Sequence, residues 1–140
     1  MIAIDTNVLL RYLLKDDESQ ADKAARLITG SERVLVTDVV LVETLWTLRG
    51  KKYSLQKDDL VSVVLSLFKE PNIRFENGQA VWKALNDYRA AEPYKGKEAD
   101  FADALIINKA KFVVNADGES FSGSYTFDIA AQNLTGAKKP

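Results

Sequence analysis

The fold is decided by residues 1–9, MIAIDTNVL. The first four residues form a short apolar run, which predicts a buried β-strand. Asp5 or Thr6 follows immediately as a helix N-cap, and Val8, Leu9, Tyr12 and Leu13 then recur at helical spacing. The chain is therefore expected to pass directly from a strand into a helix.

The same order of strand and helix recurs along the chain. Further strands are predicted at residues 33–36, 73–75 and 125–127, and apolar helices at residues 39–48, 56–69 and 77–90. A helix beginning near Glu98 is favoured over a strand at residues 111–114. Short strands that alternate with helices are typical of an α/β protein, here a three-layer α/β/α arrangement around a parallel sheet of about five strands. We expect one domain over residues 1–136 and a short tail over residues 137–140.

The composition excludes several classes of chemistry. The 140 residues contain no cysteine and no histidine, which excludes disulfides, thiolate or imidazole zinc sites and the Ser-His-Asp triad. The 19 lysines and arginines almost balance the 20 aspartates and glutamates, so the chain is not a polybasic nucleic-acid binder. No apolar run approaches the ~20 residues of a membrane helix, and no signal peptide is evident, so a cytoplasmic location is expected.

Four acidic residues stand in unusual positions. Asp5 and Asp128 directly follow predicted strands, Asp103 lies in a mixed apolar run, and Glu43 lies in an apolar helix where an unpaired buried carboxylate would be costly. Residues just beyond the carboxyl ends of parallel strands meet in one crevice, so Asp5 and Asp128 are expected at the same sheet edge. Asp100 and Asp103 are three residues apart and share a helix face.

Carboxylates that converge in one cleft repel each other, and a divalent cation relieves the repulsion. Oxygen ligands without histidine or cysteine suit Mg²⁺ or Mn²⁺. Such a site can activate water and hydrolyse phosphodiesters. The alternative for each acid taken alone is ordinary: Asp5 and Asp128 as helix N-caps, and Asp100 and Asp103 as a solvated helix face.

Four segments together resemble the PIN-domain family, and more closely its VapC-type toxins. They are residues 1–9, Glu43 in its apolar helix, residues 99–106 and residues 125–128. The resemblance implies a Mg²⁺-dependent ribonuclease, the toxin of a type II toxin–antitoxin pair. It implies catalytic acids at Asp5, Glu43, Asp103 and Asp128, the first three of them also metal ligands. It further implies a homodimer, a cognate antitoxin protein and an RNA substrate.

Other residues are assigned supporting roles. Asp100 is an additional metal ligand candidate, and Thr6 and Asn7 match the first motif, with Asn7 expected to orient Asp5 or a metal-bound water. The chain departs from the usual pattern at residues 115–124, so Asp117 or Glu119 are alternatives to Asp128. Positive charge near the acids is needed to bind RNA phosphates, and the candidates are Arg11, Lys15, Arg49, Lys51, Lys52, Lys95 and Lys97.

Three competing interpretations remain open at this stage. One is a nuclease of the same fold that acts on another nucleic acid. Another is a receiver-like signalling domain, which would require paired acids after the first strand and a lysine in place of Asp128. The last is a catalytically inactive, partner-binding member of the fold, which the complete acid set argues against.

Overall fold

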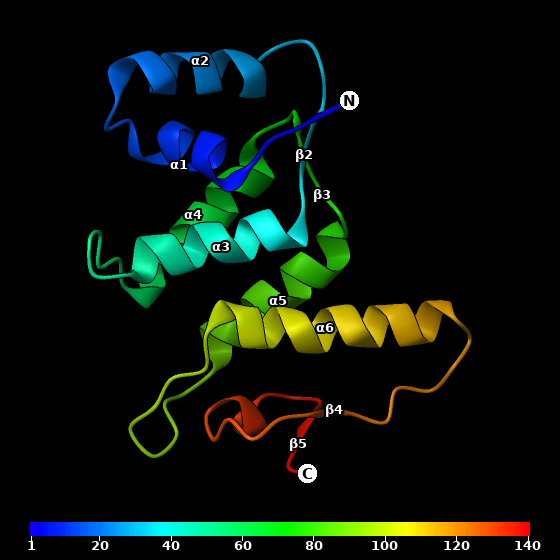
Figure 1. Ribbon diagram of the computed structural model, residues 1–140. Helices are drawn as coiled ribbons and strands as arrows, with labels where there is room; N and C mark the ends of the chain where they lie inside the picture. Colours follow the sequence, from blue (N-terminus) through cyan, green and yellow to red (C-terminus); the bar gives the residue numbers. More distant parts are fainter. The chain divides into compact units, whose positions relative to one another are not determined.

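The computed structural model describes residues 1–140 and divides into two compact units, Met1–Glu76 and Asn77–Pro140. Figure 1 shows the order of their helices and strands. The mixed α/β class with parallel strands and connecting helices is confirmed. The strand count of the predicted sheet is wrong, because the five strands are divided between two separate sheets.

The first unit contains a three-stranded parallel sheet in the order β1-β2-β3. Strand β1 spans Ile2–Ala3, β2 spans Val34–Val36 and β3 spans Ile73–Phe75, as predicted. The central strand β2 pairs with both neighbours, with Val34 opposite Ile2 on one side and Ile73 on the other. Val34 and Val36 are fully buried, which explains the apolar character of this strand.

Four helices belong to the first unit: α1 (Thr6–Leu14), α2 (Glu18–Ile28), α3 (Asp38–Arg49) and α4 (Lys57–Lys69). Each buries one apolar stripe, as the helical spacing predicts. The fully buried side chains of this unit are Leu9, Ile28, Val34, Val36, Leu41, Thr44, Leu48, Val64 and Leu67. The hydroxyl of Thr44 donates a 2.7 Å hydrogen bond to the carbonyl oxygen of Val40, which satisfies the one polar group among them.

The second unit is built on helices α5 (Gly78–Ala90) and α6 (Phe101–Ala116). Helix α6 continues through residues 111–114, which confirms the preference for a helix over a strand there. The two helices pack through apolar side chains, among them the Tyr88 and Phe101 rings, whose centroids lie 6.1 Å apart in an edge-to-face arrangement.

The C-terminal part of the second unit differs from the prediction. Strand β4 (Ser124–Tyr125) pairs in parallel with β5 (Ala137–Lys138), and the 3₁₀ helix η1 (Ala131–Asn133) lies between them in the chain. The segment expected to be a tail therefore supplies a strand. The reason is local, because the 3₁₀ turn brings residues 136–138 alongside residues 124–126. There the Ser124 amide donates to the Gly136 carbonyl oxygen, and the Thr126 amide donates to the Lys138 carbonyl oxygen.

The single domain over residues 1–136 and the three-layer arrangement stay predictions. None of the helices combines the length and the apolar character needed to cross a lipid bilayer.

Candidate functional site

Asp5 stands at the junction of β1 and α1. Its backbone is extended, and its carboxylate oxygen Oδ1 accepts a 3.0 Å hydrogen bond from the Val8 amide, so Asp5 is the N-cap of α1. The capping role predicted for this residue is therefore confirmed. The capping bond engages Oδ1 of a side chain that is exposed.

Glu43 lies on the exposed face of α3, not among buried apolar residues as the sequence had indicated. The helix turns Leu41, Leu45 and Leu48 inward, and this places Glu43 outward. The Thr6 hydroxyl donates a 3.1 Å hydrogen bond to Glu43 Oε1. Thr6 thus joins the first turn of α1 to α3 and brings Glu43 to the residue that follows Asp5.

Replacing Thr6 with valine is expected to reduce cleavage by roughly tenfold, because the loss of one hydrogen bond to a charged group costs about 1.5–3 kcal/mol at most. The isosteric valine keeps the volume of the side chain but cannot hold the Glu43 carboxylate. The measurement is the rate of RNA cleavage at saturating metal, with Thr6→Ser as the control that keeps the hydroxyl. Equal rates for the valine and serine variants would show that the contact has no positioning role.

Asp100 and Asp103 form a reciprocal cap at the start of α6. Asp100 Oδ1 accepts from the Asp103 amide at 2.9 Å, and Asp103 Oδ2 accepts from the Asp100 amide at 3.0 Å. This capping box fixes both side chains relative to the helix axis. Both carboxylates are partly buried and lie on one turn, as their spacing predicts.

Asp103 is electrostatically the most unusual acid in the protein. Burial is the largest cause of the raised pKa of Asp103; together with the negative charges of Asp100 and Asp128, and against the opposite effect of the Asp100 amide that donates to it, it brings this pKa from 3.8 to about 6. The ionised carboxylate is therefore destabilised by both desolvation and repulsion. A nearby cation would relieve both.

The raised pKa of Asp103 predicts a specific dependence of stability on pH. The folded protein binds this proton more tightly than the unfolded chain, so the free energy of unfolding falls as the pH rises from 3.8 to about 6. Because this group is partly exposed and therefore screened by solvent, the loss in the free energy of unfolding amounts to about 1 kcal/mol. Without metal, Asp103→Asn should therefore raise the melting temperature at pH 7.5 by roughly 3 °C, and the gain should vanish near pH 4. A variant less stable than the wild type at both pH values would instead indicate a structural role.

Asp128 follows the β4 segment and lies three residues before the start of η1. Its Oδ1 accepts a 2.8 Å hydrogen bond from the Ala131 amide, and its charge acts on Asp103. Asp117, the alternative proposed from sequence, caps the opposite end of the 16-residue helix α6, about 21 Å along the axis from Asp103. Glu119 follows it. The second unit therefore brings Asp128, and not Asp117 or Glu119, near Asp103.

The strands that precede Asp5 and Asp128 do not belong to one sheet. Strand β1 pairs with β2, whereas β4 pairs with β5. The prediction that both acids follow strands of a single sheet is therefore wrong. The reason is that β4 finds its hydrogen-bond partners in residues 136–138, within its own unit.

The chemistry of the acids fits a hard divalent cation. Neither unit by itself groups three or more acidic side chains closely enough to hold a metal ion. Asp5, Asp100 and Asp128 each accept a backbone amide through Oδ1. All donors are carboxylate oxygens, which favours Mg²⁺ or Mn²⁺ over zinc.

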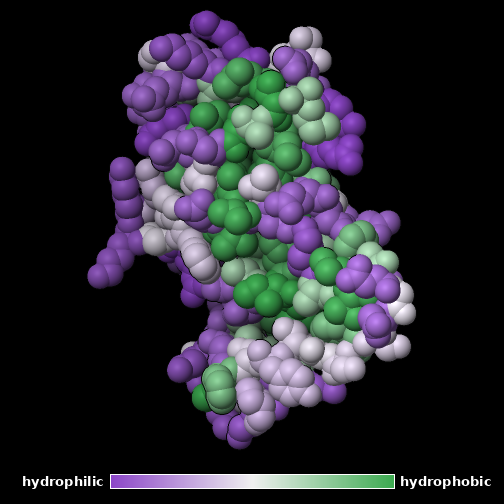
Figure 2. Space-filling view, turned by 45° about the vertical axis from the view of Figure 1, so that its right-hand side comes forward, coloured by the Kyte–Doolittle hydropathy of each residue, from purple (hydrophilic) through white to green (hydrophobic).

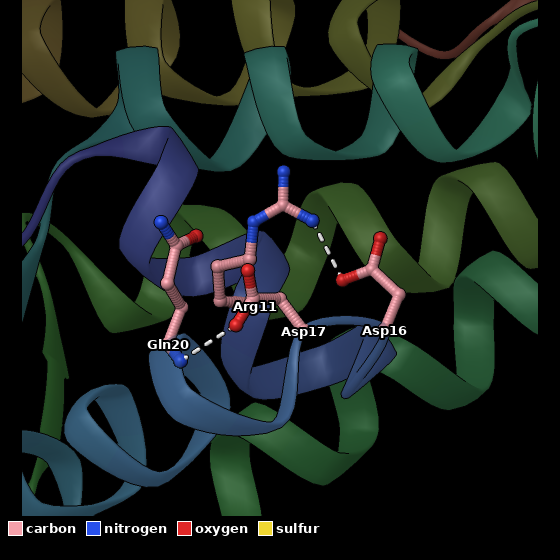
Figure 3. Close-up of polar contacts among 4 residues, drawn as sticks. All are labelled: Arg11, Asp16, Asp17 and Gln20. Carbon is pink, nitrogen blue, oxygen red and sulfur yellow. Dashed lines mark hydrogen bonds and ion pairs between the residues drawn. The ribbon is translucent and has the colours of Figure 1, made fainter.

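The predicted RNA-binding cations differ in their surroundings. Figure 3 shows the Arg11 guanidinium facing the Asp16 carboxylate, with Nη1 and Oδ1 2.6 Å apart. Within the same loop Asp17 caps α2 by accepting from the Gln20 amide. Arg11 therefore already has an anionic partner, and the pKa of Asp16 is lowered by it.

Lys52 and Lys95 lie over the rings of the adjacent tyrosines at 5.2 and 5.4 Å from their centroids. RNA contact stays a prediction for all of these cations, which are Arg11, Lys15, Arg49, Lys51, Lys52, Lys95 and Lys97, as does the role of Asn7.

Two neighbouring hollows in the second unit lie away from the acids. Both are lined by Lys83, Asn108 and Lys111, and their volumes are about 340 and 320 Å³. Asn108 is buried and donates to Asp87 Oδ2 at 2.9 Å and to the Ala104 carbonyl oxygen at 2.8 Å. None of the proposed acids lines either hollow.

Comparisons with known proteins point to one family. The model of the PIN domain matches residues 2–112 of the chain. No curated protein matches. Among solved structures, the chain is similar to VapC20 of Mycobacterium tuberculosis, described as a toxin that cleaves the sarcin–ricin loop, with 15% identity, a TM-score of 0.41, and coverage of 96% of this chain and 97% of that one.

Proposed function

Since the chain belongs to the PIN-domain family, we propose that it is an endoribonuclease that depends on Mg²⁺ or Mn²⁺. The observation that carries this proposal is the state of Asp103. Its carboxylate is partly buried beside Asp100 and under the influence of Asp128, in a chain without histidine or cysteine. Destabilised carboxylates of this kind are typical of sites that act on charged substrates.

The proposed metal ligands are Asp5, Glu43, Asp100 and Asp103, with Asp128 completing the acidic site. A bound divalent cation supplies an activated water and neutralises charge that develops on the phosphate. The protein's own part is to hold the carboxylates in place. Hydrogen bonds from backbone amides hold Asp5, Asp100, Asp103 and Asp128, and the Thr6 hydroxyl holds Glu43.

Glu43 has a distinct part in this proposal. Its Oε1 accepts from Thr6, so Oε2 on this exposed side chain would be the oxygen that holds the cation or, if the aspartates alone held the cation, the oxygen that would take the proton of the attacking water. A carboxylate is the appropriate base here, because the chain has no imidazole to perform this role.

We further propose that the chain is the toxin of a type II toxin–antitoxin pair, that it acts as a homodimer, and that a cognate antitoxin blocks its acids. Support for an interface comes from α3, where Val39 and Trp46 are 66% and 55% exposed on the same face as Glu43. Figure 2 shows apolar residues reaching the surface between hydrophilic ones on the face drawn. Light scattering at micromolar concentration tests the dimer.

The experiment that tests the nuclease proposal compares matched substrates. The purified chain is incubated with a single-stranded RNA and with DNA of the same sequence, each with Mg²⁺. We expect internal cuts in the RNA and none in the DNA, and growth arrest when the chain is expressed alone. Cutting of DNA at an equal rate would contradict the ribonuclease assignment, and an intact RNA over a range of sequences would contradict the nuclease.

A further inference from the structure

Two large aromatic side chains are exposed immediately before Asp128. Tyr125 is 62% exposed and Phe127 is 84% exposed, the highest value among the large apolar residues of the protein. Tyr125 is the last residue of β4, and Phe127 follows two residues later, directly before Asp128. We refer to Tyr125 and Phe127 as the aromatic edge.

The backbone that carries the aromatic edge is held at three points, all on Thr126. Its amide donates to the Lys138 carbonyl oxygen at 3.0 Å, its carbonyl oxygen accepts from Gln132 Nε2 at 2.7 Å, and its hydroxyl oxygen accepts from the Asp128 amide at 3.0 Å. These bonds to Lys138, Gln132 and Asp128 keep the two rings at a constant place relative to Asp128. Exposure of the rings is therefore a property of an ordered segment.

A lysine lies beside the aromatic edge. In the β4–β5 pair Lys138 is in register with Tyr125, so the two side chains project to the same face of the pair. The aliphatic part of Lys138 runs across Gly123, where an added Cβ would come within 2.8 Å of the Lys138 Cδ atom. Gly123 has a φ of +128°, which other residues rarely adopt. The turn therefore requires glycine, and the absence of a side chain there leaves room for the lysine stem.

We propose that the aromatic edge and Lys138 form a platform for single-stranded RNA, on which bases stack on Tyr125 and Phe127 while the Lys138 ammonium contacts a phosphate. Exposed aromatic rings beside a cation are the combination that binds single strands without strict sequence preference. The platform directly precedes Asp128, so a strand stacked there has its backbone at the acidic site. This inference rests on the proposed ribonuclease function and specifies how that site holds its substrate.

The test measures binding without cleavage. Fluorescence anisotropy of a labelled single-stranded RNA is recorded in EDTA for the wild type, Phe127→Ala and Tyr125→Ala. Each alanine variant is expected to bind roughly tenfold more weakly, and Phe127→Trp to bind as the wild type does. The matched control is Phe112→Ala, which removes another phenylalanine that is 43% exposed, on α6. It should leave the affinity unchanged.

Salt dependence separates the two kinds of contact. Lys138→Gln should reduce the slope of log affinity against log salt concentration by about 0.7, the value for one phosphate contact on a single strand. Phe127→Ala should leave that slope unchanged while lowering the affinity. A slope unaffected by Lys138→Gln would remove the lysine from the platform.

Several outcomes overturn the platform. One is wild-type affinity in both alanine variants, and another is an equal loss in Phe112→Ala. A third is loss of the dimer in light scattering with RNA affinity retained, which would make the aromatic edge a protein interface.

The nuclease proposal is tested separately. If the wild type binds RNA and the variants do not, but no RNA is cut with Mg²⁺, the nuclease fails and the platform stands. If the variants bind and cut RNA like the wild type, the platform fails and the nuclease proposal stands.

Discussion

Replacing Asp103 with asparagine is expected to abolish RNA cleavage while the protein remains folded. Asparagine keeps the oxygen that accepts from the Asp100 amide, so the start of α6 stays capped. The negative charge proposed to hold the cation is lost, and metal-based stabilisation is worth several kcal/mol. The expected loss is therefore on the order of a thousandfold in the cleavage rate. The measurement is the single-turnover rate with Mg²⁺, together with the circular dichroism spectrum.

The matched control for this variant is Asp117→Asn, at the other end of the same helix. It removes an identical charge from α6 and should leave the rate within about twofold of the wild type, because its carboxylate lies about 21 Å from Asp103 along the axis. Asp5→Asn and Glu43→Gln are expected to be as severe as Asp103→Asn, and Asp100→Asn and Asp128→Asn milder. If both Asp5→Asn and Asp103→Asn cleaved RNA at the wild-type rate, these two acids would have only a capping role.

Removal of divalent cations is expected to stop cleavage completely. The candidate ligands are all carboxylates, so EDTA should reduce the rate to background and Mg²⁺ or Mn²⁺ should restore it. A zinc-selective chelator should have no effect, and Ca²⁺ should bind without supporting the reaction. Cleavage that persists in EDTA would refute the metal-dependent mechanism.

The same site predicts how pH acts on metal binding. The pKa of Asp103 is about 6 without metal, so below that value a proton competes with the cation for the carboxylate. The apparent Mg²⁺ affinity should fall by about tenfold for each pH unit below 6 and should level off above it. The measurement is the Mg²⁺ concentration for half-maximal rate between pH 5 and 8. Asp103→Glu, which keeps the charge, is the variant to compare. A concentration that stays constant over this range would exclude Asp103 as a ligand.

Local signals in the sequence predicted much of the secondary structure. Asp5 and Asn77 were expected to cap helices and do so, because an N-cap needs only its own side chain and the next three residues. The apolar spacing in α1 and α6 likewise predicted helices, including the continuation of α6 through residues 111–114. These features depend on residues within one or two turns of each other, which the sequence places in order.

Features that join distant segments were not predictable in this way. Glu43 was expected to be buried, but its exposure depends on which face of α3 packs against the rest of the unit, and apolar neighbours occur on both faces. Likewise, β4 and β5 have two residues each, so their own side chains carry little information about pairing. The pairing of β4 with β5 is decided by the backbone hydrogen bonds that Thr126 and Gly136 make.

The sequence by itself limited the donors that this chain could offer to a cation. A chain without histidine or cysteine, with acids after strands and at helix starts, leaves carboxylates as the donors for a cation. Only the tertiary structure decided that Asp128, and not Asp117, acts on Asp103, and that Thr6 holds Glu43. It also revealed Tyr125 and Phe127 as exposed rings beside Lys138. The physical reason is that charge repulsion, burial and strand pairing depend on distances in space, which residue spacing along the chain does not specify beyond a helical turn.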